Sequence, residues 1–185
     1  MDTYGKIISP GTIRFERILP GPIEKVWAYL TESEKRGKWL AKGEMELIEG
    51  GKVELYFLHT DLSPSPGAVP EKYKEMENGH HFTGQVLKVQ PPFLLSFTWE
   101  NQTSEVLIEL AQKNDEVLLT LTHSKLGENK EAMISTAAGW HTHLEILAAN
   151  LNGATPGEFW ERHKELENVY SEKVQIAGSP FVRTD

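Results

Sequence analysis

Four consecutive segments in the middle of the chain alternate apolar and polar residues, and this feature constrains the fold more than any other. Alternation with period two is typical of a strand that buries one face. Short connections such as Pro91-Pro92 and Asn114-Asp115 separate the segments and favour turns. Consecutive strands with such connections predict an antiparallel meander over residues 81–89, 94–99, 105–111 and 116–123.

The residues before the meander predict one further strand, two short helices and a hairpin. Residues 12–19 alternate, and Pro20-Gly21-Pro22 then stops the pattern. Apolar residues recur at helical spacing in 23–30 and again in 33–40, which predicts two short helices. Residues 45–57 alternate on both sides of Gly50-Gly51, a glycine pair typical of a hairpin turn.

A long helix is predicted over residues 133–152, which are rich in Ala and Leu and end before Gly153, a common helix terminator. Pro156 opens a second amphipathic segment that reaches Tyr170 and packs either on its own domain or on a partner subunit; a loose tail is expected after Val174. One stripe of the long helix is expected to meet the sheet, with Ile134 and His141 at its edge; it holds Met133, Ala137, Trp140, Leu144, Leu147, Ala148 and Leu151.

This order of elements predicts an α+β fold, in which a curved antiparallel β-sheet wraps around a long C-terminal helix and two short helices follow the first strand. A chain of 185 residues suits one domain. We place that domain at residues 1–155, with residues 156–185 as a C-terminal helical extension and loose tail.

Several short motifs stand at matching places along these elements. They are Trp39-Leu40, the turn Glu49-Gly50-Gly51-Lys52-Val53, the segment from Pro91-Pro92 to Trp99, and Gly139-Trp140 with Leu144, Leu147 and Leu151. Together with the element order over residues 12–153, they resemble the helix-grip fold of the START-like (SRPBCC) superfamily, in the branch named after the activator of a heat-shock chaperone ATPase. The resemblance implies a fold more than an activity, because most of that branch has no assigned activity.

Composition excludes several classes of function. The net charge is -8 and no run of Lys or Arg occurs, so a nucleic-acid partner is not expected. The absence of cysteine excludes disulfides, thiol catalysis and iron–sulfur ligation. Neither a basic, apolar leader nor a membrane-spanning stretch is recognisable, so we expect a cytoplasmic protein without a membrane span.

A strongly curved sheet cannot lie flat against one helix, so a space lined by alternate strand residues is expected between them. This predicts a site for an apolar or aromatic small molecule, with residues 61–79 as its entrance loop. The same side chains have a second interpretation as ordinary core, because core and cavity wall are continuous in this architecture. The residues expected to line or gate the cavity are Trp27, Trp39, Phe57, Phe82, Phe97, Trp99, Trp140, His141 and Leu144.

Histidines and glutamates give weaker candidates for chemistry. Adjacent strand residues face opposite sides and helical residues at i and i+2 point about 200° apart, so neither His80-His81 nor His141 with His143 predicts a metal site. His141 is either a satisfied border histidine or a donor to a ligand in the cavity. General bases would require an inward orientation that raises the carboxyl pKa; the candidates are Glu54, Glu105, Glu109 and Glu145.

No Ser-His-Asp order, phosphate-binding glycine loop or zinc signature occurs, so no catalytic residue and no cofactor are predicted. The leading hypothesis is a non-catalytic protein that binds an apolar or aromatic small molecule, such as a lipid or a polyketide-like compound. One alternative is a protein-interaction module that serves a chaperone or a stress response. A second is a cofactor-independent cyclase or dehydratase. The sequence is compatible with a monomer and with a homodimer.

Overall fold

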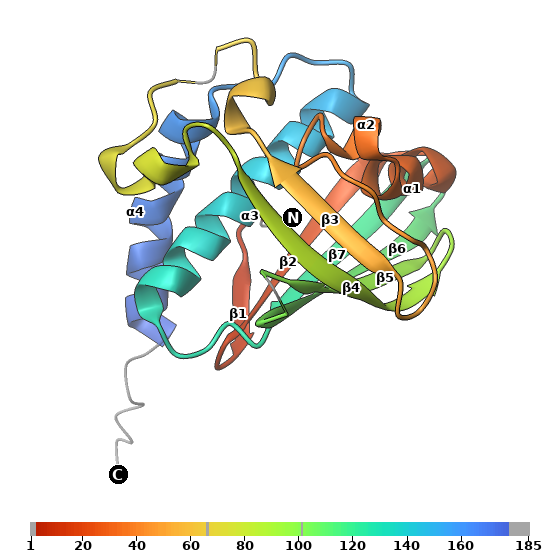
Figure 1. Cartoon of the computed structure of the whole chain (residues 1–185), viewed down its shortest axis with the longest axis horizontal. Coiled ribbons are helices and arrows are strands. Elements are labelled where there is room, and N and C mark those ends of the chain that lie inside the picture. Colours follow the sequence, from red (N-terminus) through yellow and green to blue (C-terminus); the bar gives the residue numbers. More distant parts are fainter. Residues whose placement is uncertain (1–2, 66, 101, 178–185) are drawn as a thin grey trace.

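One curved sheet of seven strands surrounds a long helix in the computed structural model, which describes residues 3–65, 67–100 and 102–177 (Figure 1). Neighbouring strands are antiparallel, in the order β1-β2-β7-β6-β5-β4-β3. The predicted α+β helix-grip fold and its meander are therefore confirmed. The strands are β1 (Lys6–Ser9), β2 (Thr12–Pro20), β3 (Lys52–Phe57), β4 (His80–Gln90), β5 (Leu94–Trp99), β6 (Ser104–Lys113) and β7 (Glu116–Ser124).

Helix α3 (Lys130–Leu151) lies between the sheet and helix α4 (Phe159–Ala177) (Figure 1). It begins after Asn129, whose side chain accepts a hydrogen bond of 3.1 Å from the Ala132 backbone N–H, and Gly153 follows its end with a φ of 70°. The other helical segments are short. They are α1 (Ile23–Thr31), α2 (Ser33–Arg36) and the 3-10 turns η1 (His59–Asp61) and η2 (Glu71–Met76).

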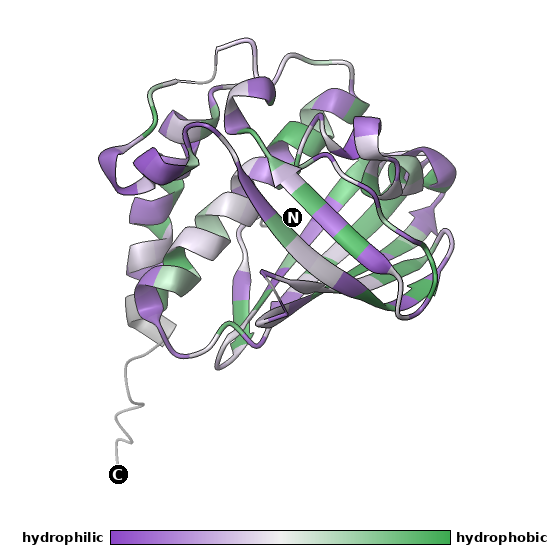
Figure 2. Ribbon diagram, viewed as in Figure 1, coloured by the Kyte–Doolittle hydropathy of each residue, from purple (hydrophilic) through white to green (hydrophobic). Residues whose placement is uncertain are grey.

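The core lies between the concave side of the sheet and α3. In β7, Val117, Leu119 and Leu121 are fully buried while the residues between them are partly exposed, as the period-two pattern predicts. Figure 2 shows the same alternation along β3. Each fully buried Leu contributes about 1.5–3 kcal/mol by leaving water. Ala137 of α3 is fully buried, and its small side chain lets the helix approach the sheet.

Three local features differ from the sequence predictions. Strand β1 has only four residues without alternation, so it is defined by its pairing with β2 rather than by a pattern. The first arm of the hairpin at residues 45–57 forms only an isolated bridge, Met45 with Val53. Lys42 bridges Tyr56 just before it, and Gly43, with a φ of 127°, lies between the two bridges. Helix α4 continues beyond Val174 to Ala177, and the rest of the predicted tail, residues 178–185, lies outside the described residues.

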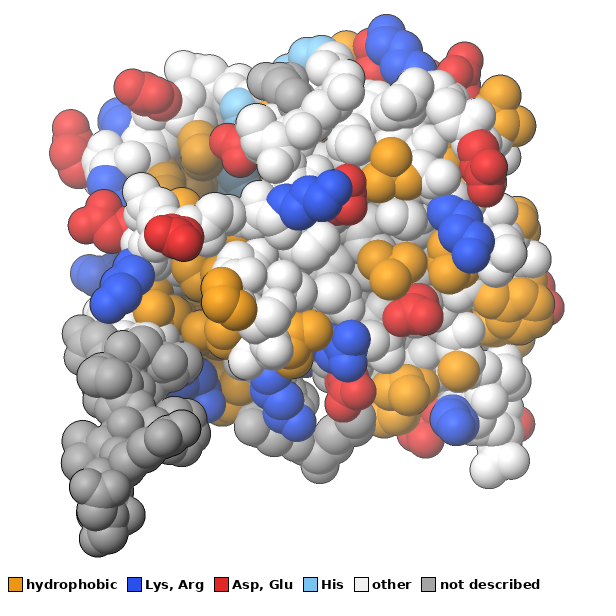
Figure 3. Space-filling model, turned by 90° about the horizontal axis from the view of Figure 1, so that it is seen from below, with side chains coloured by type: hydrophobic (Ala, Val, Ile, Leu, Met, Phe, Trp, Pro, Cys, Tyr) orange, Lys and Arg blue, Asp and Glu red, His pale blue; other side chains and the backbone are white. Residues whose placement is uncertain are grey.

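The C-terminal segment packs on α3 of its own chain, where Phe159, Trp160, Leu166 and Tyr170 are buried. On the face shown in Figure 3, Lys and Arg side chains alternate with Asp, Glu and scattered hydrophobic residues, so charge of one sign does not gather there. Within the described residues, none of the helices has the length and apolar composition needed to cross a bilayer.

Candidate ligand-binding cavity

A cavity of about 120 Å³ lies where β3, β4 and β5 meet α3 and α4. Its volume is below the roughly 150 Å³ of a cavity known to bind benzene and well below the roughly 300–1,000 Å³ of pockets for drug-sized ligands. As it stands it therefore has room for a few water molecules and is slightly smaller than a cavity that holds one benzene ring. Aromatic and imidazole rings form most of the wall: Phe57, His59, Tyr73, His80, Phe82, Trp99, Trp140, His143, Phe159, Trp160 and His163.

One face of α3 and the adjoining strands of the sheet direct these rings towards each other. On α3, Thr136, Trp140 and His143 are spaced by four and three residues and so share a helix face. On the sheet, Phe57 of β3 pairs with His80 of β4, and their rings stack with centroids 4.5 Å apart. The cavity is thus built from a helix face and an edge of the sheet, and no single segment could form it alone.

The residues of η2 cover the cavity. The hydroxyl of Tyr73 lies 2.7 Å from Ser135 Oγ of α3 and donates to Glu167 Oε1 of α4 at 2.5 Å. Lys72 forms an ion pair of 2.6 Å with the same carboxylate. The segment predicted as an entrance loop is therefore attached to both helices.

Four histidines line the cavity, and their pKa values are all lowered. Burial and the neighbouring imidazoles lower the pKa of His59 to about 2. Burial lowers the pKa of His80 to about 4, and that of His143 to about 3 despite a hydrogen bond with the Trp39 backbone. Burial also lowers the pKa of His163, against the opposing effect of Glu167. At neutral pH all four rings are uncharged.

Several buried nitrogen atoms of these residues have no hydrogen-bond partner within the described part of the chain. They are Nδ1 of His59, His80 and His163, and Nε1 of Trp160. A buried polar atom without a partner costs about 1–3 kcal/mol. Over residues 3–65, 67–100 and 102–177, no group of three or more His, Asp or Glu side chains is placed to hold a metal ion. The wall thus combines apolar rings with unused hydrogen-bonding capacity.

A second, outer hollow of about 580 Å³ adjoins the cavity along β3, the last strand of the sheet. Leu40, Phe57 and His80 line both spaces and so lie between them. Gly37, Lys42, Tyr56 and Asp61 are among the other residues of the outer hollow.

The structure brings four of the residues predicted from sequence to the cavity wall: Phe57, Phe82, Trp99 and Trp140. Trp39 lies behind the wall, where its carbonyl accepts a hydrogen bond from His143 Nδ1 at 2.6 Å. The other four lie outside the lining: Trp27, Phe97, His141 and Leu144. Sequence reasoning did not assign His59, Tyr73, His143, Phe159, Trp160 and His163 to the cavity, although the helical spacing of the last three was visible.

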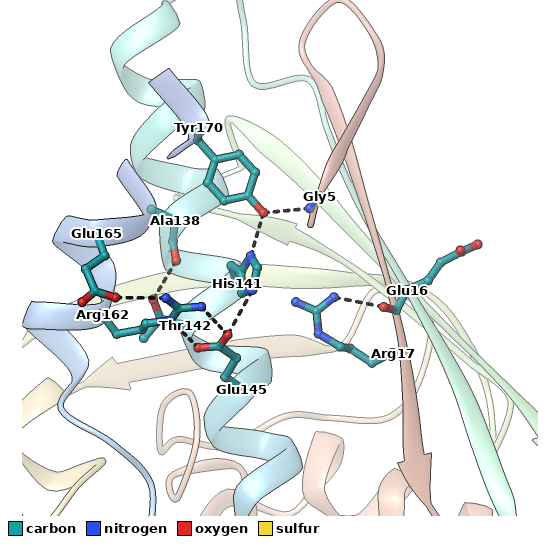
Figure 4. A network of polar contacts seen from close by, with 10 residues as sticks. All are labelled: Gly5, Glu16, Arg17, Ala138, His141, Thr142, Glu145, Arg162, Glu165 and Tyr170. Carbon is teal, nitrogen blue, oxygen red and sulfur yellow. Dashed lines mark hydrogen bonds and ion pairs between the residues drawn. The ribbon is translucent and has the colours of Figure 1, made fainter. Parts of the chain in front are cut away.

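His141 belongs to a separate network, here called the polar clamp, which joins Gly5, just before β1, to α3 and α4 (Figure 4). The Tyr170 hydroxyl accepts from the Gly5 backbone N–H at 2.7 Å and lies 2.8 Å from His141 Nδ1. The other ring nitrogen of His141 lies 3.1 Å from Glu145 Oε1. Arg162 donates two hydrogen bonds of 2.8 Å to the same carboxylate, a strong bidentate pair.

The four glutamates considered as general bases lack the inward orientation and raised carboxyl pKa that this role would require. Burial raises the pKa of Glu145, but hydrogen bonds from Arg162 and His141 outweigh it and lower the pKa to about 2. The Lys52 ammonium lowers the pKa of Glu54, with which it forms an ion pair of 2.6 Å. Glu105 pairs with Lys125, and Glu109 is exposed. None of these four carboxylates lines the cavity.

Comparison with known structures places the fold in a wider group. The protein encoded by gene BPP1335 of Bordetella parapertussis is 38% identical, over 93% of this chain and 91% of that chain, with a TM-score of 0.78. CalU16 of Micromonospora echinospora is 21% identical over 88% of both chains, with a TM-score of 0.63. EF2215 of Enterococcus faecalis, described as a conserved protein of unknown function, is 22% identical over 92% of this chain and 90% of that chain, with a TM-score of 0.63. The last two show the fold alone.

Among curated proteins, none matches the chain significantly. The family model described as activator of Hsp90 ATPase homolog 1-like protein matches residues 20–152. Helix α4 begins after this range, so Phe159, Trp160 and His163 close the cavity from outside the matched family core. Because that match spans most of the chain and the 38% identity with the Bordetella protein covers nearly all of it, this chain belongs to the family of activator of Hsp90 ATPase homolog 1-like proteins.

Proposed function

We propose that the protein binds a small aromatic or apolar molecule in the cavity between β3–β5, α3 and α4. Phe57, Phe82, Trp99 and Trp140 would contact the ligand, together with the rings that α4 contributes. The observation that carries this proposal is the coexistence of an aromatic wall with buried nitrogen atoms that have no partner. A folded protein retains such costly groups more readily where a ligand or water satisfies them.

The chemistry of the wall supports binding more directly than it supports catalysis. The candidate general bases lie outside the cavity, and the lowered pKa values of His59 and His143 make these imidazoles weak bases. Stacked and tilted rings offer flat apolar surfaces, which aromatic ligands match in shape. Because the cavity is slightly smaller than one known to hold benzene, a ring would have to shift wall side chains or extend into the outer hollow.

Native mass spectrometry of freshly purified protein, followed by a thermal-shift screen with fatty acids and with aromatic compounds of one to three rings, tests the proposal. A ligand at 100 times its Kd stabilises the folded state by about 2.7 kcal/mol, which raises Tm by roughly 5–10 °C for a chain of this size. The expected result is a co-purified mass or a saturable shift in Tm.

A matched pair of variants locates the binding. Gly139→Leu places a side chain in the cavity wall and is expected to abolish the shift, whereas Ala149→Leu adds the same group to α3 outside the cavity and is expected to preserve it. The absence of any bound mass and of any shift would contradict the proposal and direct attention to protein partners. A shift of equal size in both variants would place the ligand elsewhere.

A further inference from the structure

The hydrogen bonds of His143 determine which of its ring nitrogens carries the proton. Nδ1 lies 2.6 Å from the carbonyl oxygen of Trp39, and a carbonyl only accepts. Nδ1 must therefore donate. In an uncharged imidazole the other nitrogen, Nε2, then has a lone pair and acts as an acceptor. His143 lines the cavity and is 6% exposed, so this acceptor has little access to bulk water.

In His163 the position of the ring proton is fixed the other way round, on Nε2. It hydrogen-bonds to the backbone of Ser135, where only the carbonyl can accept, while its Nδ1 has no partner. The proton therefore resides on Nε2, and the lone pair is on Nδ1. The nearest carboxylate oxygen, Glu167 Oε2, lies 3.9 Å from Nδ1 and is itself an acceptor. Among the described residues, this imidazole acceptor of the wall thus lacks a donor.

One indole N–H provides the opposite function. Nε1 of Trp160 can only donate, and it is buried without a partner in a residue that is 2% exposed. No Lys, Arg, Asp or Glu side chain is among the described residues that line the cavity. The wall therefore offers acceptors and a donor but no charge to neutralise an ion.

We propose, on the basis of the function proposed above, that the ligand carries an uncharged hydroxyl group on an aromatic ring. The hydroxyl donates to an imidazole lone pair of His143 or His163 and accepts from the indole N–H of Trp160. The ring fills the inner cavity, and any substituent opposite the hydroxyl extends past Leu40, Phe57 and His80 into the outer hollow.

Related ligands without this group fit less well. A methyl ether of the same ring cannot donate, so it would leave the imidazole lone pairs buried and unused. A carboxylate would bring a negative charge against those lone pairs with no cation in the wall. The site is therefore selective for a phenol over an ether and over a carboxylate of the same length.

Three probes with the same ring and the same pentyl chain test this selectivity: 4-pentylphenol, 4-pentylanisole and 4-pentylbenzoate, titrated calorimetrically at pH 7.5. The phenol is expected to bind at least about 10-fold more tightly than the anisole, as for a site that hydrogen-bonds a ligand hydroxyl, and the benzoate most weakly. Equal affinity of phenol and anisole, or tightest binding of the benzoate, would overturn the inference and leave the proposed binding function intact.

Two conservative variants connect the selectivity to the imidazoles. His143→Asn keeps a donor for the Trp39 carbonyl but removes the distal acceptor, and His163→Gln keeps the bond to Ser135 but removes the Nδ1 acceptor. At least one of them is expected to reduce the phenol-to-anisole ratio severalfold, whereas His141→Asn, on the same helix but outside the cavity wall, is expected to preserve it. An unchanged ratio in both cavity variants would contradict the assignment.

The two proposals fail differently. If other aromatic compounds bind in a manner that Gly139→Leu abolishes, but 4-pentylphenol does not, the binding function stands and the hydroxyl assignment is wrong. If no compound of either set binds, the binding function itself is contradicted.

Discussion

The polar clamp and the cavity are built on the same two helices, yet they use their buried polar groups in opposite ways. His141 and His143 are two residues apart on α3, and Arg162 and His163 are neighbours on α4. In the clamp, each ring nitrogen of His141 has a partner, and Glu145 receives two hydrogen bonds from Arg162. In the cavity wall, by contrast, imidazole and indole nitrogens lack partners.

The difference separates buried polar groups that stabilise the fold from groups that lower its stability. A satisfied network recovers the cost of removing its groups from water, and here it attaches α4 and the N-terminal segment to α3. Unpartnered groups only lower stability. The proposed function gives the unpartnered groups beside the aromatic rings of the cavity a role that the clamp does not need.

The largest effect that would separate the two regions is expected on acidification. The folded pKa values of the cavity histidines His59, His80 and His143 lie at about 2, 4 and 3, below the ordinary value of about 6.5, so the unfolded chain binds protons first. Stability is retained above pH 6.5 and lost as the pH falls towards 3. Each histidine contributes about 1.4 kcal/mol per pH unit, so the free energy of unfolding should fall by about 4 kcal/mol between pH 7.5 and 5.5.

The clamp should respond only at lower pH. Glu145 has its pKa lowered from 4.5 to about 2, so its contribution is present above pH 4.5 and is lost below it. Urea denaturation at a series of pH values measures both ranges. A free energy of unfolding that stays constant from pH 7.5 to 5.5 would show that the imidazoles of the folded state accept protons readily.

Tyr170→Phe should have the next largest effect, because it removes the hydroxyl that joins Gly5 to His141 and leaves both groups without it. The expected loss is about 1–3 kcal/mol in the free energy of unfolding. The control Tyr29→Phe removes a hydroxyl outside the clamp and should change stability by less than about 0.5 kcal/mol. Equal losses in the two variants would mean that the clamp does not stabilise the attachment of α4.

In the cavity wall, His59→Phe should leave stability within about 1 kcal/mol of the original protein, because it removes a nitrogen atom that has no partner and keeps a flat ring. That ring can still pack on Phe57 and Phe159. Thermal and urea denaturation give the comparison with Tyr170→Phe. A loss above about 2 kcal/mol would show that the His59 imidazole has a hydrogen-bond partner in solution, as the groups of the polar clamp do.

Lys72→Ala should have the smallest effect. Its ammonium group forms an ion pair with Glu167, but the Lys72 side chain is 59% exposed, and exposed pairs contribute about 0–1 kcal/mol. Chemical denaturation at low and high salt measures the change. A loss of about 2 kcal/mol would assign the covering of the cavity to this pair rather than to the hydrogen bonds of Tyr73.

Local patterns were sufficient for the fold and for the strand side of the cavity. Period-two alternation places Phe57, Phe82 and Trp99 on the inner face of their strands, and four consecutive strands leave few topologies other than a meander. The pattern is informative because one face of the sheet is buried. Residues 45–49 show its limit, since they alternate in sequence but form only the isolated bridge of Met45 with Val53, and Leu47 is exposed.

The helix side could not be resolved from the sequence. Helix α3 is covered by the sheet on one side and by α4 on the other, so residues that point about 200° apart are both buried: His141 is 1% exposed and His143 is 6% exposed. Periodicity of α3 alone cannot tell which of them faces the cavity. Three separate segments contribute His59, His80 and His163, and no local sequence pattern indicates that these residues lie together.

The bond between Gly5 and Tyr170 joins positions 165 residues apart, and this separation matters for the order in which the protein is synthesised. The ribosome makes residues 20–152 before α4, and at about 5–20 residues per second the stretch from 152 to 177 takes roughly 1–5 s to add. During that interval the nascent chain lacks Trp160, His163 and Tyr170. Neither the polar clamp nor the α4 side of the cavity wall can therefore form until α4 has been made.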